Sequence, residues 1–137
     1  MEEQAAIPSL LALLLSDYVI VEAGTNKKTI VGVFDNLWAA EVPTARQIGL
    51  FARMTDMEGS YGFTIKVVQL DADDEPVVAG GKMSPVNVTD RLQTVDVALN
   101  LPMTVFPQFG RYEFQLFSND VYLGRAIVNV CKQEVQA

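Results

Sequence analysis

The sequence predicts an all-β fold, an antiparallel two-layer sandwich of about eight strands in a single domain over residues 1–137. Short segments rich in Val, Ile, Phe and Tyr recur along the chain, with turn residues between them. In residues 92–101, apolar and mostly polar positions alternate, as in a strand with one buried face. With 137 residues, 50% of them hydrophobic, the chain is long enough to bury its own core.

The predicted strands are separated by short connections, which favours antiparallel pairing between neighbours. In chain order they cover residues 11–22, 28–35, 47–55, 61–70, 77–82, 92–101, 111–117 and 121–131. The first of them is ambiguous, because Pro8 and Ser9 followed by a Leu/Ala run are also typical of a helix start. We favour a strand there, since residues 18–21 are aromatic and β-branched, with a helical turn before Ser16 as the alternative.

The first hairpin is apolar on both faces. Residues 10–15, 18–21 and 30–34 carry more apolar side chains than one buried face of a sandwich strand can use. Two explanations stay open: a loop or short helix of the same chain covers the second face, or a partner does, in the first place a second copy.

The closing hairpin, residues 109–131, is the clearest fold marker. Gly110 precedes Tyr112 at the entry to a strand, a spacing typical of the tyrosine corner in immunoglobulin-like (Ig-like) sandwiches. Tyr112 is therefore expected to bond nearby backbone through its hydroxyl. After the turn at residues 118–120, the apolar positions fall out of phase, which predicts a bulge at Gly124-Arg125.

Charge and composition argue against several partners. The net charge is −7, and Lys27-Lys28 is the only basic pair, so nucleic acid and anionic membranes are not expected to bind. Cys131 is the only cysteine, so no intramolecular disulfide forms, which fits a reducing compartment. The acidic start and the short apolar run at 10–15 resemble neither a secretion signal nor a membrane span, and we expect a cytoplasmic protein.

The sequence indicates no enzyme and no cofactor. It contains no histidine, which removes the common catalytic triads and histidine-rich zinc sites. The densest acidic cluster holds Asp71, Asp73, Asp74 and Glu75, but it lacks the glycine and distant glutamate of an EF-hand, and turn chemistry explains it. We therefore expect no metal site.

Three residues after the second predicted strand are candidates for contact with a ligand or partner. They are Asp35, Asn36 and Trp38, the last being the only tryptophan. Tryptophan is favoured at binding hot spots, and the neighbouring polar side chains suit a polar ligand. The alternative is a Trp that caps the core while Asp35 and Asn36 satisfy loop backbone.

Four pieces of the chain resemble a bacterial family of short proteins that is defined only as a domain of unknown function. The pieces are residues 16–18, residues 29–35, residues 51–54, and Phe106-Pro107 with residues 110–114 and 123–125. The resemblance implies a small Ig-like sandwich with no assigned activity, substrate or cofactor. Ser16 stands where a cysteine is common in that family, and Phe109 where a proline is common.

These observations favour a non-enzymatic protein-interaction or assembly module that self-associates through the first hairpin. A sandwich that binds a small ligand or a divalent metal is the alternative.

Overall fold

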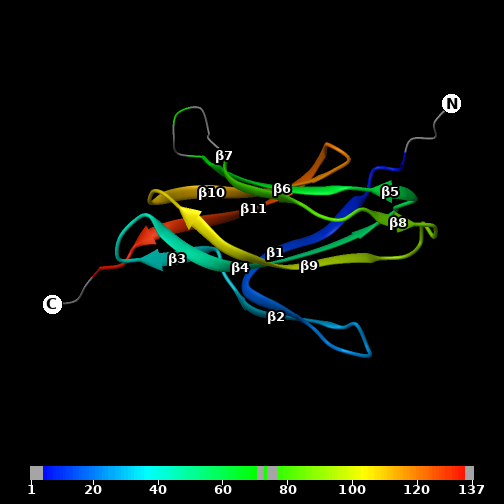
Figure 1. Ribbon diagram of the computed structural model, residues 1–137, viewed down its shortest axis with the longest axis horizontal. Helices are drawn as coiled ribbons and strands as arrows, with labels where there is room; N and C mark the ends of the chain where they lie inside the picture. The colour runs from blue at the N-terminus through cyan, green and yellow to red at the C-terminus, as the bar shows by residue number, and fades with distance from the viewer. Residues whose placement is uncertain (1–4, 71–72, 74–76, 135–137) are drawn as a thin grey trace.

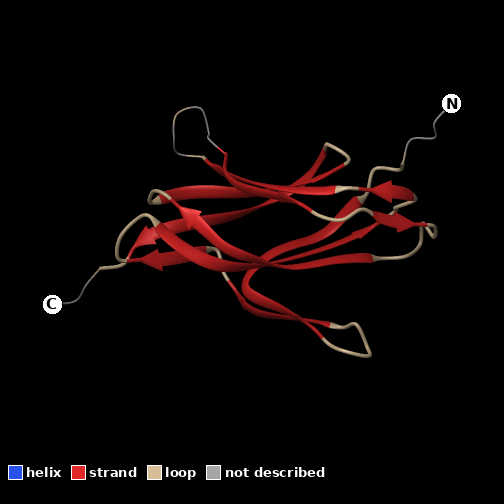
Figure 2. Cartoon of the chain, in the orientation of Figure 1, coloured by secondary structure: helices blue, strands red, loops and turns tan. Residues whose placement is uncertain are grey.

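The computed structural model describes residues 5–70, 73 and 77–134, and within these ranges the chain forms strands and loops only (Figure 2). The ambiguous first segment is strand β1, Ser9–Val21, so the strand prediction is confirmed and no helical turn precedes Ser16.

Two main sheets form the two layers of the sandwich (Figure 1). Sheet A has the order β2-β1-β4-β9, with β2 at Lys28–Val33, β4 at Thr44–Thr55 and β9 at Val95–Phe106. Sheet B has the order β3-β11-β10-β6-β7. Its strands are β3 (Asn36–Ala39), β11 (Val121–Lys132), β10 (Gly110–Ser118), β6 (Phe63–Gln69) and β7 (Val77–Lys82). A small third sheet pairs β5, Gly59–Tyr61, with β8, Val86–Val88.

The predicted sandwich is confirmed, with two differences in detail. The short strands β3, β5 and β8 add to the eight that the sequence predicts, because pieces of three to four residues show no periodicity. The pair β3–β11 is parallel, whereas antiparallel pairing was expected throughout. Phe34 and Asp35 carry the chain from sheet A to sheet B without a hairpin reversal, which sets β3 in the direction of β11.

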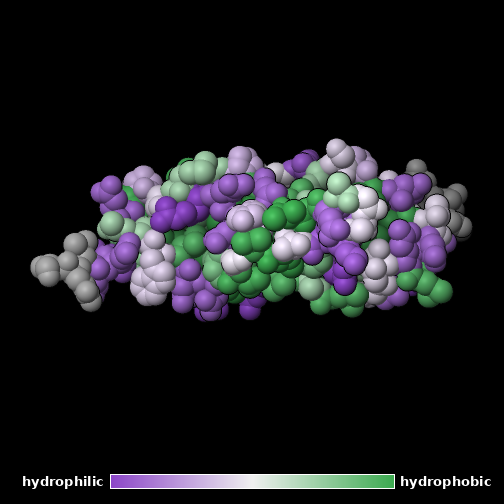
Figure 3. Space-filling model, turned by 90° about the horizontal axis from the view of Figure 1, so that it is seen from below, coloured by the Kyte–Doolittle hydropathy of each residue, from purple (hydrophilic) through white to green (hydrophobic). Residues whose placement is uncertain are grey.

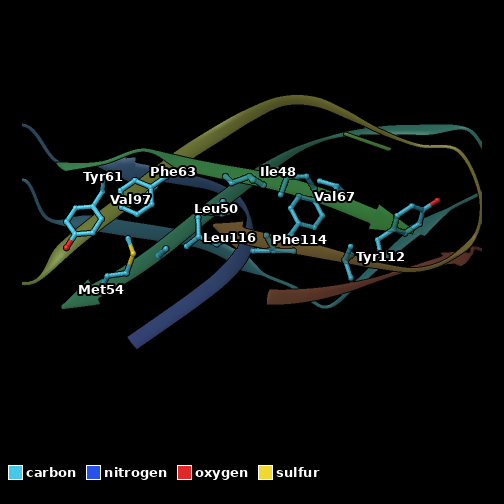
Figure 4. Packing of buried hydrophobic residues seen from close by; sticks show 14 of the residues in the cluster. Ile48, Leu50, Met54, Tyr61, Phe63, Val67, Val97, Tyr112, Phe114 and Leu116 are labelled. Atoms are coloured by element: carbon cyan, nitrogen blue, oxygen red, sulfur yellow. The ribbon is translucent and has the colours of Figure 1, made fainter. Parts of the chain in front are cut away.

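The core lies between sheets A and B and is dominated by aromatic and branched side chains (Figure 4). Phe106 packs edge-on against Tyr112, with ring centroids 5.0 Å apart. The largest fully buried side chains come from all three sheets and from the loop before β5: Tyr61, Phe63, Phe106, Tyr112, Phe114, Ile48, Leu50, Met54, Met57, Leu116, Val67 and Val128.

Tyr112 is the tyrosine corner that the sequence predicts, as expected of an Ig-like sandwich. Its hydroxyl donates to the Gln108 carbonyl at 2.7 Å and accepts from the Gln108 N–H at 3.1 Å. The predicted bulge is also present, one residue earlier than expected. The register of β10 and β11 shifts between Leu116↔Gly124 and Phe117↔Tyr122, which leaves Leu123 as the extra residue.

Strand β1 changes its pairing partner halfway along. From Ser9 to Ser16 it pairs with β4, and from Ser16 to Val21 it pairs with β2. At the crossing, a Cβ on Gly49 of β4 would lie 2.7 Å from the Tyr18 Cα and 2.7 Å from the Ser16 Oγ. Only glycine lets the β1 backbone pass this close, and the β1–β2 hairpin beyond the crossing extends below sheet A (Figure 1).

We expect Gly49→Ala to lower the free energy of unfolding by about 1–3 kcal/mol, because the added methyl forces the Tyr18 backbone away from β4. Urea denaturation measures the change. Gly81→Ala in β7 is the matched control, since no atom lies within 4 Å of its Cβ position. Equal stability of the two variants would contradict the close crossing.

Candidate interaction surface

The hairpin of β1 and β2 is held against the outer side of sheet A by a side-chain amide. The Asn100 Oδ1 of β9 accepts from the Val19 N–H at 2.8 Å, and its Nδ2 donates to the Val19 carbonyl at 2.9 Å. Both backbone groups lie on the edge of β1 that no longer pairs with β4 beyond Ser16. The Asn100 side chain therefore replaces one rung of the β1–β4 ladder, so these two groups stay satisfied.

An ion cluster holds the hairpin nearer to its tip. Asp96 of β9 accepts from the Arg53 guanidinium of β4 at 2.7 and 3.0 Å, and the Lys28 Nζ of β2 lies 3.6 Å from the same carboxylate. The Asp96 side chain is only 12% exposed. The hydrogen bond from Arg53 lowers the pKa of Asp96 below its usual value, although partial burial acts in the opposite direction.

The side of the hairpin that faces sheet A is apolar and closed. Val19 and Phe51 are both buried, 4% and 7% exposed, yet neither belongs to the cluster between the sheets. Phe51 pairs with Ala98, which lies between Asn100 and Asp96 on β9. The same chain thus covers one of the two apolar faces that the sequence shows.

The other side of the hairpin is open and also apolar. We call it the hairpin face, and it consists of Leu14, Tyr18, Ile20, Val31 and Val33. Tyr18 is 43%, Ile20 46% and Val33 58% exposed. Figure 3 views the molecule from the side of β2 and shows hydrophobic side chains gathered near the middle of this surface. Contiguous exposed apolar side chains of this kind mark contact sites.

Each of the four outer edges of the two main sheets is interrupted in its own way. An exposed edge is normally protected by charge, proline, a bulge or short length. Edge strand β3 has four residues, β7 contains Gly80 and Gly81 and ends in Lys82, and β9 carries Pro102 beside a register shift. In β2, residues 29–33 carry neither charge nor proline, and Lys28 pairs with Asp96. Gly32, at a φ of 70°, interrupts this edge instead.

The structure separates the three candidate residues of the sequence. Asn36 and Trp38 are two residues apart and therefore lie on the same face of β3. The Asn36 Oδ1 accepts a hydrogen bond from the Asn129 Nδ2 at 3.3 Å, and the Trp38 side chain is exposed. Asp35 instead lines a shallow groove of about 390 Å³ together with Leu14 and Val33 of the hairpin face. Asp35 is therefore part of the hairpin surface, and Trp38 is not.

A second apolar depression lies at the open side of the sandwich, between the edges of β7 and β9. Its volume is about 450 Å³. Its lining includes apolar residues of both sheets and the loop residue after β7: Ile65, Val67, Ala79, Met83, Leu99 and Leu101. We call it the β7–β9 groove.

The acidic cluster gives no site in the described part of the chain. Asp73 is exposed, and Asp71, Asp74 and Glu75 lie outside the described residues. Among the residues that are described, no three or more His, Cys, Asp or Glu side chains are grouped to hold a metal ion. The described ranges also contain no helix that is long and apolar enough to cross a membrane.

Fold and surface together define a small Ig-like β-sandwich with an apolar hairpin attached to its outer side. The chain belongs to DUF6941, a family of unknown function, whose model matches residues 11–131. The resemblance to a family of unknown function is thus confirmed. No curated protein matches the chain in sequence.

Solved structures show a similar fold at low identity. The alkylpurine DNA glycosylase AlkC of Pseudomonas fluorescens, bound to DNA with an abasic-site analogue, superposes with a TM-score of 0.54 at 10% identity, covering 90% of this chain and 30% of that one. A β-glucosidase of Listeria innocua superposes with a TM-score of 0.48 at 8% identity, covering 93% of this chain and 16% of that one. An immunoglobulin-like protein of Pseudomonas aeruginosa superposes with a TM-score of 0.40 at 12% identity, covering 92% of this chain and 98% of that one. This chain therefore spans a minor part of the two enzymes, and the likeness concerns the fold alone.

We expect Asp96→Asn to loosen the hairpin and to remove part of the acid sensitivity of folding. The pKa of Asp96 is lower in the folded protein than in the unfolded chain, so its contribution is complete above about pH 4 and disappears as the pH falls through the lowered value. Hydrogen exchange of the 17–33 amides and urea unfolding between neutral and acid pH measure both effects. Asp120→Asn, in an exposed turn, is the control and should change neither.

Proposed function

We propose that this protein is a non-enzymatic, cytoplasmic protein-interaction module that self-associates through its first hairpin. The observation that carries the proposal is the hairpin face, whose apolar side chains stay exposed although the opposite side of the same hairpin is buried on sheet A. Covering Tyr18, Ile20 and Val33 removes apolar area from water, the main driving force of association. A second copy is the partner that the chain itself provides.

The chemistry of the described residues supports a role without catalysis. The sequence has no histidine, and the thiol of Cys131, its one cysteine, is partly buried and donates to the Asn129 carbonyl at 3.7 Å. The net charge of −7 also favours a protein partner over nucleic acid or an anionic membrane.

We expect Ile20→Lys to raise the dissociation constant of self-association at least about tenfold, because the contact would have to desolvate an ammonium group. Analytical ultracentrifugation over a concentration series measures it. Leu92→Lys is the matched control: Leu92 is 89% exposed, lies in the loop between β8 and β9, is not part of the hairpin face, and should leave association unchanged. A monomer at high micromolar concentration that binds no hydrophobic dye would contradict the proposal.

A small apolar ligand in the β7–β9 groove is the second candidate. The groove volume of about 450 Å³ lies in the range of ligand sites, and its lining is mostly apolar. A ligand at 100 times its Kd would stabilise the fold by about 2.7 kcal/mol. Ala79→Phe, which fills the groove, should abolish that thermal shift, whereas Ala23→Phe in the exposed hairpin turn should not.

A thermal-shift screen with a panel of small metabolites, with calcium and with EDTA separates the candidates. A shift with a metabolite that Ala79→Phe removes supports the groove. A shift with calcium that EDTA reverses would support the metal alternative at Asp71, Asp73, Asp74 and Glu75. No shift with any compound leaves protein contact as the function.

A further inference from the structure

We propose that the β7–β9 groove binds a straight-chain carboxylate of the fatty-acid class, with its alkyl chain between the two sheets and its carboxylate at Lys82 on the rim. This inference rests on the second candidate of the proposed function, the apolar ligand in the groove, and not on self-association at the hairpin face. It starts from the groove itself, a depression of about 450 Å³ at the open side of the sandwich.

The groove is open because β7 places no large side chain in it. Residues that oppose each other in an antiparallel pair carry their side chains on the same face of the sheet. Ala79 opposes Val67 and Gly81 opposes Ile65, so both positions of β7 face the interior, as their buried partners do. A Cβ on Gly81 would nevertheless have no neighbour from elsewhere in the chain within 4 Å. The space beside Gly81 is therefore unfilled groove and not packed core.

The walls of the groove are apolar and come from two sheets. Ile65 and Val67 of β6 are buried, and Leu99 and Leu101 of β9 are half-buried. On the β7 side, residues 78–83 line the groove without a gap, a length of about 16 Å. A long apolar space between two strand edges suits an extended alkyl chain, whose removal from water drives binding.

The charge at the groove favours an anionic head group. Among the described residues that line it, Lys82 is the only one with a charged side chain, and none is acidic. Lys82 is exposed and forms no ion pair with another described residue. The chain as a whole has a net charge of −7, so an unpaired cation beside an apolar groove selects a ligand that carries the opposite charge.

The backbone of β7 adds hydrogen-bond donors at the same rim. The Met83 N–H donates to the Phe63 carbonyl at 3.0 Å, in register with the β6–β7 ladder, and neither a register shift nor a positive φ interrupts residues 80–83. Residues that bond one neighbouring strand alternate with residues whose N–H and C=O point away from it. Gly80 and Lys82 therefore direct their N–H groups to the free edge of β7, the last strand in the order of sheet B. A carboxylate there can accept from one of these N–H groups and from the Lys82 ammonium.

Calorimetric titration with decanoate, below its critical micelle concentration, tests the ligand class. We expect one decanoate to bind per chain. Decanol and decyltrimethylammonium carry the same alkyl chain with a neutral or a cationic head group, and their Kd should be about three- to fivefold higher for the alcohol and at least about tenfold higher for the cation.

Gly81→Leu tests the place of the alkyl chain. The added side chain would extend into the groove from an inward position with free space around its Cβ, so the fold is kept while the groove is filled. The Kd for decanoate should rise at least about tenfold. Ala79→Phe is a second blocking variant, and Ile20→Lys on the hairpin face is the matched control that should leave the Kd unchanged. Circular dichroism confirms that each variant is folded.

Lys82→Gln tests the place of the carboxylate, because it removes the charge and keeps a polar side chain. We expect the Kd for decanoate to rise about three- to fivefold, as for an exposed ion pair, and the Kd for decanol to stay the same. Lys132→Gln, at the exposed end of β11, is the control and should change neither.

The outcomes separate this inference from the functions proposed above. Decanoate binding that Gly81→Leu abolishes and Lys82→Gln weakens supports it. Decanol that binds as tightly as decanoate would overturn the carboxylate and leave an apolar ligand in the groove. Decanoate binding that survives Gly81→Leu but is lost in Ile20→Lys would overturn the groove site in favour of the hairpin face. Binding of none of the three compounds would overturn both the inference and the second candidate, whereas hairpin self-association is decided by ultracentrifugation alone.

Discussion

The exchange of partners by β1 at Ser16 is the constraint on which the rest of the surface depends. Up to Ser16 the strand pairs with β4. Beyond Ser16 it passes over Gly49, and its remaining ladder partner is β2. A larger residue at position 49 would meet the Tyr18 backbone and would keep β1 from crossing. The crossing moves the hairpin out of the plane of the sheet, so that one side of the hairpin is buried against sheet A and the hairpin face is exposed to solvent.

Three kinds of contact hold the hairpin, and their magnitudes differ. Burying Val19 and Phe51 contributes about 1.5–3 kcal/mol for each side chain, which is the largest share. The two Asn100 hydrogen bonds contribute about 0.5–1.5 kcal/mol each, and their main effect is to prevent unsatisfied backbone groups in β1. The Lys28–Asp96 contact adds little, as ion pairs near the surface do, but it determines where the tip lies. Apolar burial therefore provides the stability, and the polar contacts provide the orientation.

Local pattern was sufficient to predict the sandwich, the eight longer strands, the Tyr112 corner and the bulge near Gly124, because each of these depends on neighbours in the sequence. The roles of Asp96 and Asn100 could not be predicted. Both occupy polar positions in the alternating pattern of residues 92–101, and such a pattern suggests that their side chains face solvent. Only the crossing of β1 brings Lys28 and Val19 into contact with them. Asp35, Asn36 and Trp38 are adjacent in sequence, but the change of sheet between β2 and β3 sends Asp35 toward the hairpin and Trp38 toward β11. The apolar excess of the first hairpin was visible in the sequence. Its division into a covered and an open face was not.

The outer edges of the two main sheets all carry features that oppose continued strand pairing. Pro102 and the register shift in β9, the glycines of β7 and the four residues of β3 leave these strands poor templates for continued pairing. In β2, Gly32 at a φ of 70° breaks the regular extended backbone, so this strand is a poor template as well. The apolar hairpin face is therefore exposed without a regular strand edge beside it that could continue a sheet into a fibre, although β2 has the β-branched character of an aggregation-prone segment.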